Sequence, residues 1–191
     1  LLEREGIHKG WKEVVNKRLK RLGVIAWAVY VGEQEGINTG HTLLQKLIYL
    51  LQEGKGIDLD YKYKMYYYGP YCENVWADLN YLEDVKAITI EADPTGFGYR
   101  IYPKNAIESL LDFADNETRK KVSELLQFLG HRPVRELECL ATALYVYKEL
   151  SGAHNRELLE IVVKRVRTLK PHLSSKEVED AINVLKEYGL L

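Results

Sequence analysis

The sequence has 191 residues, of which 46% are hydrophobic and 29% are charged, and its net charge at pH 7 is −1. This length and composition are typical of a globular protein with one large or two small domains. No apolar run approaches the roughly 20 residues needed to span a bilayer, which excludes a transmembrane helix. The two cysteines, Cys72 and Cys139, lack the spacing of a disulfide framework or a zinc site, so we expect a cytoplasmic protein.

The charge is distributed unevenly along the chain. Residues 1–22 contain seven Lys or Arg and three acids, whereas residues 23–102 contain six Lys or Arg and eleven acids. Residues 11–22 are expected to form a helix, on which Lys12, Lys17, Arg18, Lys20 and Arg21 crowd beside an apolar face. A solvated surface is the favoured interpretation of these cations, and a phosphate-binding strip is the alternative.

The next segments predict two apolar helices. Gly23 either breaks or loosens the first helix, and residues 24–34 are apolar nearly all round, which indicates burial. Asn38 or Thr39 is expected to cap the following helix, whose leucine-rich face runs from Leu43 to Leu51. Gln45 and Lys46 are expected to lie on its other side.

Residues 61–68, YKYKMYYY, predict a strand, and Gly69-Pro70 is expected to begin a helix because proline suits the first helical position. Residues 85–91 and 97–102 predict a hairpin, joined by the turn Asp93-Pro94-Thr95-Gly96. Two helices followed by such a hairpin predict a winged helix with the hairpin as its wing.

After Pro103 the pattern is helical throughout. We expect five helices, which begin at the caps Asn105 and Asn116, at Pro133, at Asn155 and at the capping box Ser174-x-x-Glu177. The fold class predicted is mainly α (α+β), with a winged-helix-like domain at 1–103 and a helical domain at 104–191. A bundle is the favoured arrangement of these helices, and a second helix-turn-helix formed by the last two is the alternative.

Two motifs in the first half of the chain resemble the YwgA-like group of prokaryotic proteins. They are LQKLIY at residues 44–49 and YYYGPY at residues 66–71, and the resemblance covers about residues 24–102. Cys72 stands where that group usually has a small serine. The resemblance implies a winged-helix-like fold in a prokaryotic cytoplasm, and no substrate or catalytic residue. A looser similarity to Panacea-type antitoxin domains implies a protein partner.

The sequence is compatible with two functions. The fold favours a DNA-linked regulator, for which the candidate phosphate contacts are Lys12, Lys17, Arg18, Lys20, Arg21, Lys62, Lys64 and Arg100. However, residues 65–85, which include the expected recognition helix, contain four acids and no Lys or Arg, which disfavours contact with phosphates. The alternative is a protein-binding module, for which the candidate contacts are Tyr66, Tyr68, Tyr71, Glu73, Asn74 and Asp78.

The tyrosines allow two interpretations. Tyr61, Tyr63 and Tyr67 are expected to pack in the core. For each of Tyr66, Tyr68 and Tyr71, a core position and an interface position are equally favoured. A homodimer is an open alternative, because winged-helix regulators commonly pair their half-site readers.

No pattern predicts an enzyme, a cofactor or a metal site. The five histidines lack metal-ligand spacing, and Cys72 is expected to be a buried small residue. Asp58, Asp60 and Lys62 show a weak similarity to the acidic core of metal-dependent nucleases, which ranks third among the functions considered.

Overall fold

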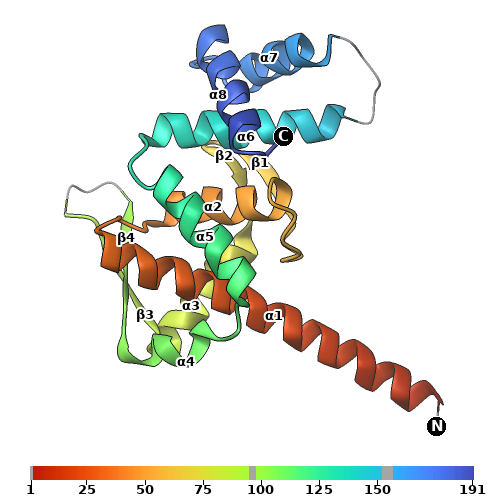
Figure 1. Ribbon diagram of the computed structural model, residues 1–191, viewed down its shortest axis with the longest axis vertical. Coiled ribbons are helices and arrows are strands. Elements are labelled where there is room, and N and C mark those ends of the chain that lie inside the picture. Colours follow the sequence, from red (N-terminus) through yellow and green to blue (C-terminus); the bar gives the residue numbers. More distant parts are fainter. Residues whose placement is uncertain (1, 95–97, 152–156) are drawn as a thin grey trace.

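The computed structural model describes residues 2–94, 98–151 and 157–191, with side chains from residue 13 onward, and its fold is mainly α with two small antiparallel hairpins (Figure 1). The predicted fold class is therefore confirmed. The elements are α1 (Leu2–Glu35), α2 (His41–Glu53), β1 (Lys64–Tyr66), β2 (Gly69–Tyr71), α3 (Glu73–Asp84), β3 (Ile88–Ala92), β4 (Tyr99–Pro103), the 3-10 helix η1 (Asn105–Ile107), α4 (Glu108–Leu111), α5 (Asn116–Leu129), α6 (Val134–Leu150), α7 (Leu158–Leu169) and α8 (Ser175–Glu187).

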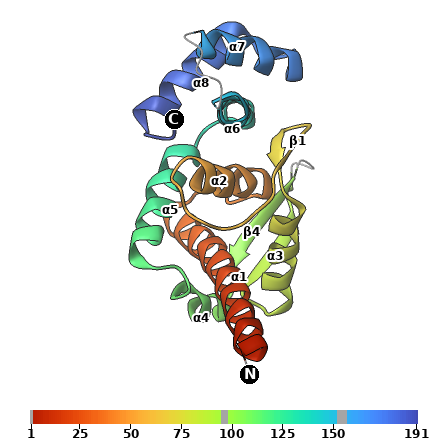
Figure 2. The same ribbon diagram turned by 90° about the vertical axis from the view of Figure 1, so that its right-hand side faces the viewer.

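Helix α1 is one continuous helix, so of the two alternatives for Gly23 the break is wrong. Its first half extends away from the rest of the molecule, and its second half lies against α5 and β4 (Figures 1 and 2). A Cβ atom at Gly23 would lie 2.7 Å from the backbone nitrogen of Ala114. Gly23 therefore allows α1 to pack closely against the segment after α4. The helix continues through Gly23 because one glycine in a helix costs only about 1 kcal/mol.

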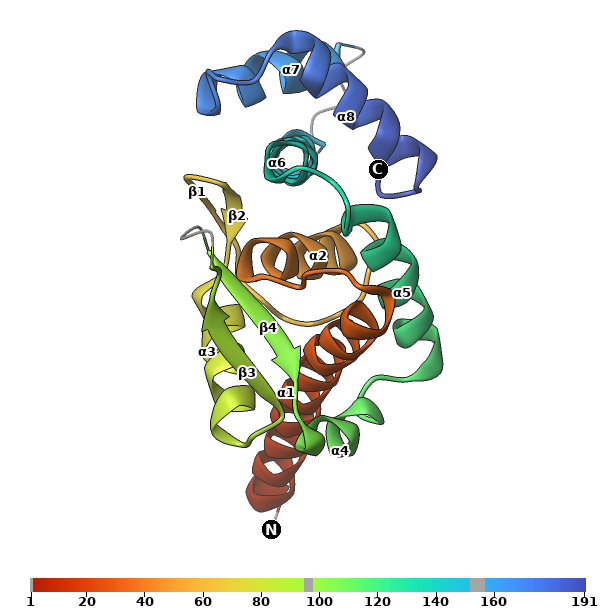
Figure 3. The ribbon, with the colours of Figure 1, turned by 90° about the vertical axis from the view of Figure 1, so that its left-hand side faces the viewer.

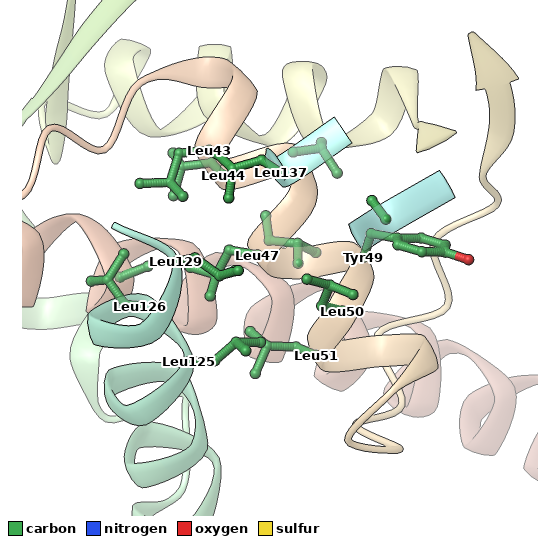
Figure 4. Close-up of a cluster of buried hydrophobic side chains, with 14 of the residues drawn as sticks. Leu43, Leu44, Leu47, Tyr49, Leu50, Leu51, Leu125, Leu126, Leu129 and Leu137 are labelled. Carbon is green, nitrogen blue, oxygen red and sulfur yellow. The ribbon is translucent and has the colours of Figure 1, made fainter. Parts of the chain in front are cut away.

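Helix α2 lies at the centre of the molecule, between α1, α5 and α6 (Figure 3). Every residue from Leu43 to Leu51 is buried, and its leucines pack against those of α5 and against Leu137 of α6 (Figure 4). Gln45 and Lys46 are also buried, which contradicts their expected outward position. Strand β2 covers that side of the helix.

The segment after α2 differs from the prediction of one strand followed directly by a helix. Met65 of β1 pairs with Pro70 of β2, so Pro70 lies in a strand, and α3 begins only at Glu73 after Cys72 as its N-cap. A two-residue turn, Tyr67–Tyr68, reverses the chain, and Gly69 follows it with φ +86°. Pro70 is tolerated because a short two-stranded sheet has open edges where a backbone N–H is not required.

The second hairpin confirms the expected wing strands. Strands β3 and β4 are antiparallel, with Ile90 opposite Ile101. Part of the expected turn, residues 95–96, lies outside the described residues. The order α1, α2, α3, β3, β4 is that of a winged helix, and the β1–β2 hairpin is inserted between its second and third helices.

The helix starts of the C-terminal half were predicted with mixed success. Pro133 precedes α6, and the capping box Ser174–Glu177 opens α8, as expected. Asp115 caps α5 in place of Asn116, because its carboxylate accepts the N–H of Thr118 at 2.8 Å. Lys104 is the N-cap of η1, so Asn105 is not a cap. The expected start at Asn155 lies outside the described residues.

The buried residues form one cluster that runs from Leu22 to Leu190. Helix α5 packs on both α1 and α2, while α6 packs on α2 and also contacts α7 and α8. In the described ranges no helix is long and apolar enough to cross a membrane.

Candidate functional site

The β1–β2 hairpin is attached to α2 by two neighbouring side chains. The amide of Gln45 donates to the carbonyl of Cys72 at 2.9 Å and accepts the N–H of Cys72 at 3.1 Å. The ammonium of Lys46 donates to the carbonyl of Pro70 at 2.8 Å. The two sequence motifs therefore contact each other. Gln45 and Lys46 of the LQKLIY motif bind the backbone of Pro70, in the YYYGPY motif, and of Cys72, which follows it.

A second lysine attaches the hairpin turn to the C-terminal helices. Lys170, which follows α7, donates to the carbonyl of Tyr66 at 2.7 Å and also to that of Tyr67. Its ammonium lies 3.0 Å from Oε1 of Glu138 on α6, where the alignment is not that of a hydrogen bond, so the attraction is Coulombic. The ring of His172 lies 3.1 Å from the other oxygen of Glu138.

These charged groups are buried, and burial of a charge lowers the stability of the folded protein unless the charge keeps its hydrogen-bond and ion-pair partners. Lys46, Glu138 and Lys170 are only 3–5% exposed. Burial lowers the pKa of Lys46 to about 8; the nearby carboxylate of Glu138 opposes that shift, and the Lys170 ammonium adds to it. Because an unpaired buried charge costs several kcal/mol, the lysines hold the hairpin backbone in one conformation.

We call residues 64–71 the tyrosine hairpin, because its turn carries adjacent exposed tyrosines. The exposed fractions of Tyr66, Tyr67 and Tyr68 are 59%, 76% and 65%. The expectation that Tyr67 packs in the core is wrong, since it occupies the turn rather than a covered strand. Tyr61 is buried as expected, and Tyr63 and Tyr71 are half-buried.

Gly69 fits this hairpin closely, and we expect Gly69→Ala to destabilise the protein by about 1–3 kcal/mol. Its φ of +86° is unfavourable for alanine, and an added Cβ would lie 3.0 Å from Oγ1 of the buried Thr142. Urea unfolding measures the loss. Gly56→Ala is the matched control, because Gly56 has φ +68° with open space around it. Equal losses in both variants would mean that Thr142 does not restrict the hairpin.

Two grooves share Met65 and Tyr66 in their linings. One has a volume of about 520 Å³ and is lined by Lys62, Lys64, Met65, Tyr66, Tyr71, Cys72, Glu73 and Asn74. The other has about 470 Å³ and is lined by Met65, Tyr66, Tyr67, Leu169, Lys170 and His172. The tyrosine hairpin is therefore a ridge between two concave surfaces.

Five of the six residues predicted for partner binding lie on this ridge or line the groove beside it, and Asp78 does neither. Tyr66, Tyr68, Tyr71, Glu73 and Asn74 are exposed or half-exposed. Asp78 is only 5% exposed, so its expected outward position on α3 is wrong.

Asp78 faces α1 instead. Its carboxylate accepts the hydroxyl of Tyr61 at 2.7 Å and lies 3.8 Å from Arg18 and 3.7 Å from Arg21. Two cations that were candidates for phosphate contact therefore neutralise a buried acid of the expected recognition helix.

Several other candidate phosphate contacts are also paired with acids. Lys17 lies 3.2 Å from Asp58, Lys62 2.8 Å from Asp60, and Arg100 2.6 Å from Asp93. In the part of the chain that the structure describes, Lys20 and Lys64 form no ion pair. The side chain of Lys12 lies outside the described residues.

The residues considered for chemistry are occupied or buried. Asp58 and Asp60 pair with lysines, and Cys72 is 3% exposed and unbonded to another cysteine. Among the side chains described, no group of three or more His, Cys, Asp or Glu could hold a metal ion. The tyrosine hairpin and its grooves therefore offer a partner surface contact and hydrogen bonds.

Comparison with protein-family models finds no match for this chain, and comparison with curated proteins finds no significant one. The resemblance to the YwgA-like group therefore rests on the motif residues alone.

Proposed function

We propose that this protein is a non-enzymatic protein-interaction module of the cytoplasm, and that the tyrosine hairpin is its binding surface. One observation carries the proposal. Tyr66, Tyr67 and Tyr68 are 59–76% exposed, and the buried Lys170 holds the backbone of their turn by donating hydrogen bonds to the carbonyls of Tyr66 and Tyr67.

Exposed aromatic groups on a rigid support fit an interface for a physical reason. Tyrosine supplies a large apolar ring with a polar tip, and it loses little conformational entropy when it is bound. Because Lys46 and Lys170 already fix the backbone, a partner would not have to order it on binding. The resemblance to antitoxin-like domains also supports a protein partner.

The proposal is tested by cross-linking from the hairpin. We incorporate the photo-reactive residue p-benzoyl-phenylalanine at Tyr67, or at Tyr81 as control, in the cells that naturally contain the protein. Tyr81 is also exposed, at 39%, but it lies near the far end of α3. A protein cross-linked from Tyr67 and not from Tyr81 is the expected result.

That partner is then purified and titrated against defined variants. The double variant Tyr67→Ser/Tyr68→Ser is expected to bind at least about 30-fold more weakly, because central aromatic contacts contribute about 2 kcal/mol or more. Tyr81→Ser is expected to bind like the unaltered protein. Equal cross-linking from both positions, or unchanged affinity of the double variant, would contradict the proposal.

A DNA-linked regulator is the second candidate, and the winged-helix order of α1, α2, α3, β3 and β4 supports it. The pairing of Arg18 and Arg21 with Asp78 weighs against it. Fluorescence anisotropy with duplex DNA between about 50 and 200 mM salt tests this candidate. Steeply salt-dependent binding that is lost in Lys20→Glu/Lys64→Glu would favour DNA over a protein partner.

A further inference from the structure

A row of aromatic rings connects the tyrosine hairpin to the wing. Each ring centroid lies 4.5–6.0 Å from the next. The order is Tyr67, Tyr66, Tyr71, His41, Trp76 and Tyr99, so the row crosses β1, β2, the first residue of α2, α3 and β4. In Figure 3 the two hairpins and α3 lie on the same side of the molecule.

The tyrosine hydroxyls and the indole N–H of this row can each donate a hydrogen bond. Among the described residues, none forms a hydrogen bond with the indole N–H of Trp76 or with the hydroxyls of the four tyrosines in the row. Trp27 shows the contrast, because its indole N–H donates to the carbonyl of Arg119 at 3.1 Å and to the hydroxyl of Ser123 at 3.0 Å. The row therefore presents apolar rings together with free donors.

The backbone of the hairpin is less suited to accept a strand from a partner. The carbonyls of Tyr66 and Tyr67 accept from Lys170, and that of Pro70 accepts from Lys46. Strand addition needs free carbonyl groups as well as N–H groups at the edge. Within the tyrosine hairpin, the side-chain rings are therefore better suited to recognition than the backbone.

We propose that the aromatic row binds a proline-rich segment of a partner protein in the polyproline II conformation, a proposal that rests on the proposed interaction function. A polyproline backbone has carbonyl acceptors and no N–H donors, which complements a surface of tyrosine hydroxyls and an indole N–H. Its rings pack on aromatic faces, and its preformed conformation loses little entropy on binding. Burial lowers the pKa of His41 to about 4, so its ring stays neutral within the row at neutral pH.

The first test uses fluorescein-labelled decaproline, which spans about 30 Å at about 3.1 Å per residue. Anisotropy is expected to show a dissociation constant of about 0.1 mM or below. Tyr66→Ala is expected to weaken binding at least about tenfold. Trp76→Phe keeps a ring but lacks the indole N–H, and it is expected to weaken binding about fivefold, as for one lost hydrogen bond. Tyr81→Ala, outside the row, is expected to have no effect.

Controls separate this inference from other outcomes. A glycine-serine peptide of equal length is expected not to bind, and the melting temperature of each variant shows whether it is folded. Failure of decaproline to bind at about 5 mM overturns the inference, as does equal binding of the glycine-serine peptide. Tighter binding of single-stranded oligothymidine overturns it in favour of base stacking. If the protein cross-linked from Tyr67 contains no proline-rich segment, the inference fails while the proposed interaction function stands.

Discussion

Lys170→Met is expected to lower the free energy of unfolding by about 3 kcal/mol at pH 7. The substitution removes the nearest cation of Glu138, which is 4% exposed, and it also removes the donor to the carbonyls of Tyr66 and Tyr67. A buried carboxylate that loses its nearest cation costs several kcal/mol, and His172 and the nearby charge of Lys46 compensate only in part. Urea unfolding followed by circular dichroism measures the loss as a lower midpoint.

Two further variants show whether the buried charge is the cause. Lys170→Met/Glu138→Gln is expected to be more stable than Lys170→Met, because the amide carries no charge to be compensated. Lys148→Met is the matched control, since Lys148 forms a 3.2 Å ion pair with Glu53 that is partly exposed, and its loss is expected to cost less than about 1 kcal/mol. A loss as small for Lys170→Met as for Lys148→Met would mean that Lys170 does not hold the hairpin.

The apolar elements of the fold could be predicted from the sequence because their periodicity is strong. The leucine face of α2 and the two strands of the wing were found this way, and the start of α8 was found from its capping-box motif. The start of α3 was missed because Pro70 fits the first turn of a helix and an edge strand equally well. Only the turn at Tyr67–Tyr68 and the positive φ of Gly69 distinguish the two, and both depend on tertiary contacts.

The polar support of the site could not be predicted from periodicity. A pattern analysis places polar residues outward, yet Gln45 and Lys46 are buried because their partners are backbone groups some 24–27 residues away. The joint presence of the LQK and YGPY motifs was the available signal. For Glu138 and Lys170 no signal exists in the sequence, since their contact joins residues on separate elements whose packing a single chain pattern does not specify.

The unfolding free energy is also expected to depend on pH through His41. Burial, together with the nearby charge of Lys46, lowers the pKa of His41 in the folded protein from its ordinary value of 6.5 to about 4. Between these values the unfolded chain binds a proton at His41 and the folded protein does not, so acid favours unfolding. Above pH 6.5 the protonation of His41 does not lower the free energy of unfolding. As the pH falls from 6.5 toward 4 this free energy decreases, and at pH 5 the decrease is about 2 kcal/mol.

His41→Gln isolates this contribution from that of the carboxylates, which also titrate in acid. Glutamine does not titrate and retains a hydrogen-bonding group near Gln45, whose amide lies 3.3 Å from the His41 ring. Urea unfolding at pH 7 and pH 5 is compared for both proteins, and the fall in stability is expected to be about 2 kcal/mol smaller in the variant. The same fall in both proteins would show that His41 accepts a proton in the folded state, and the aromatic row would then carry a positive charge at its centre in mild acid.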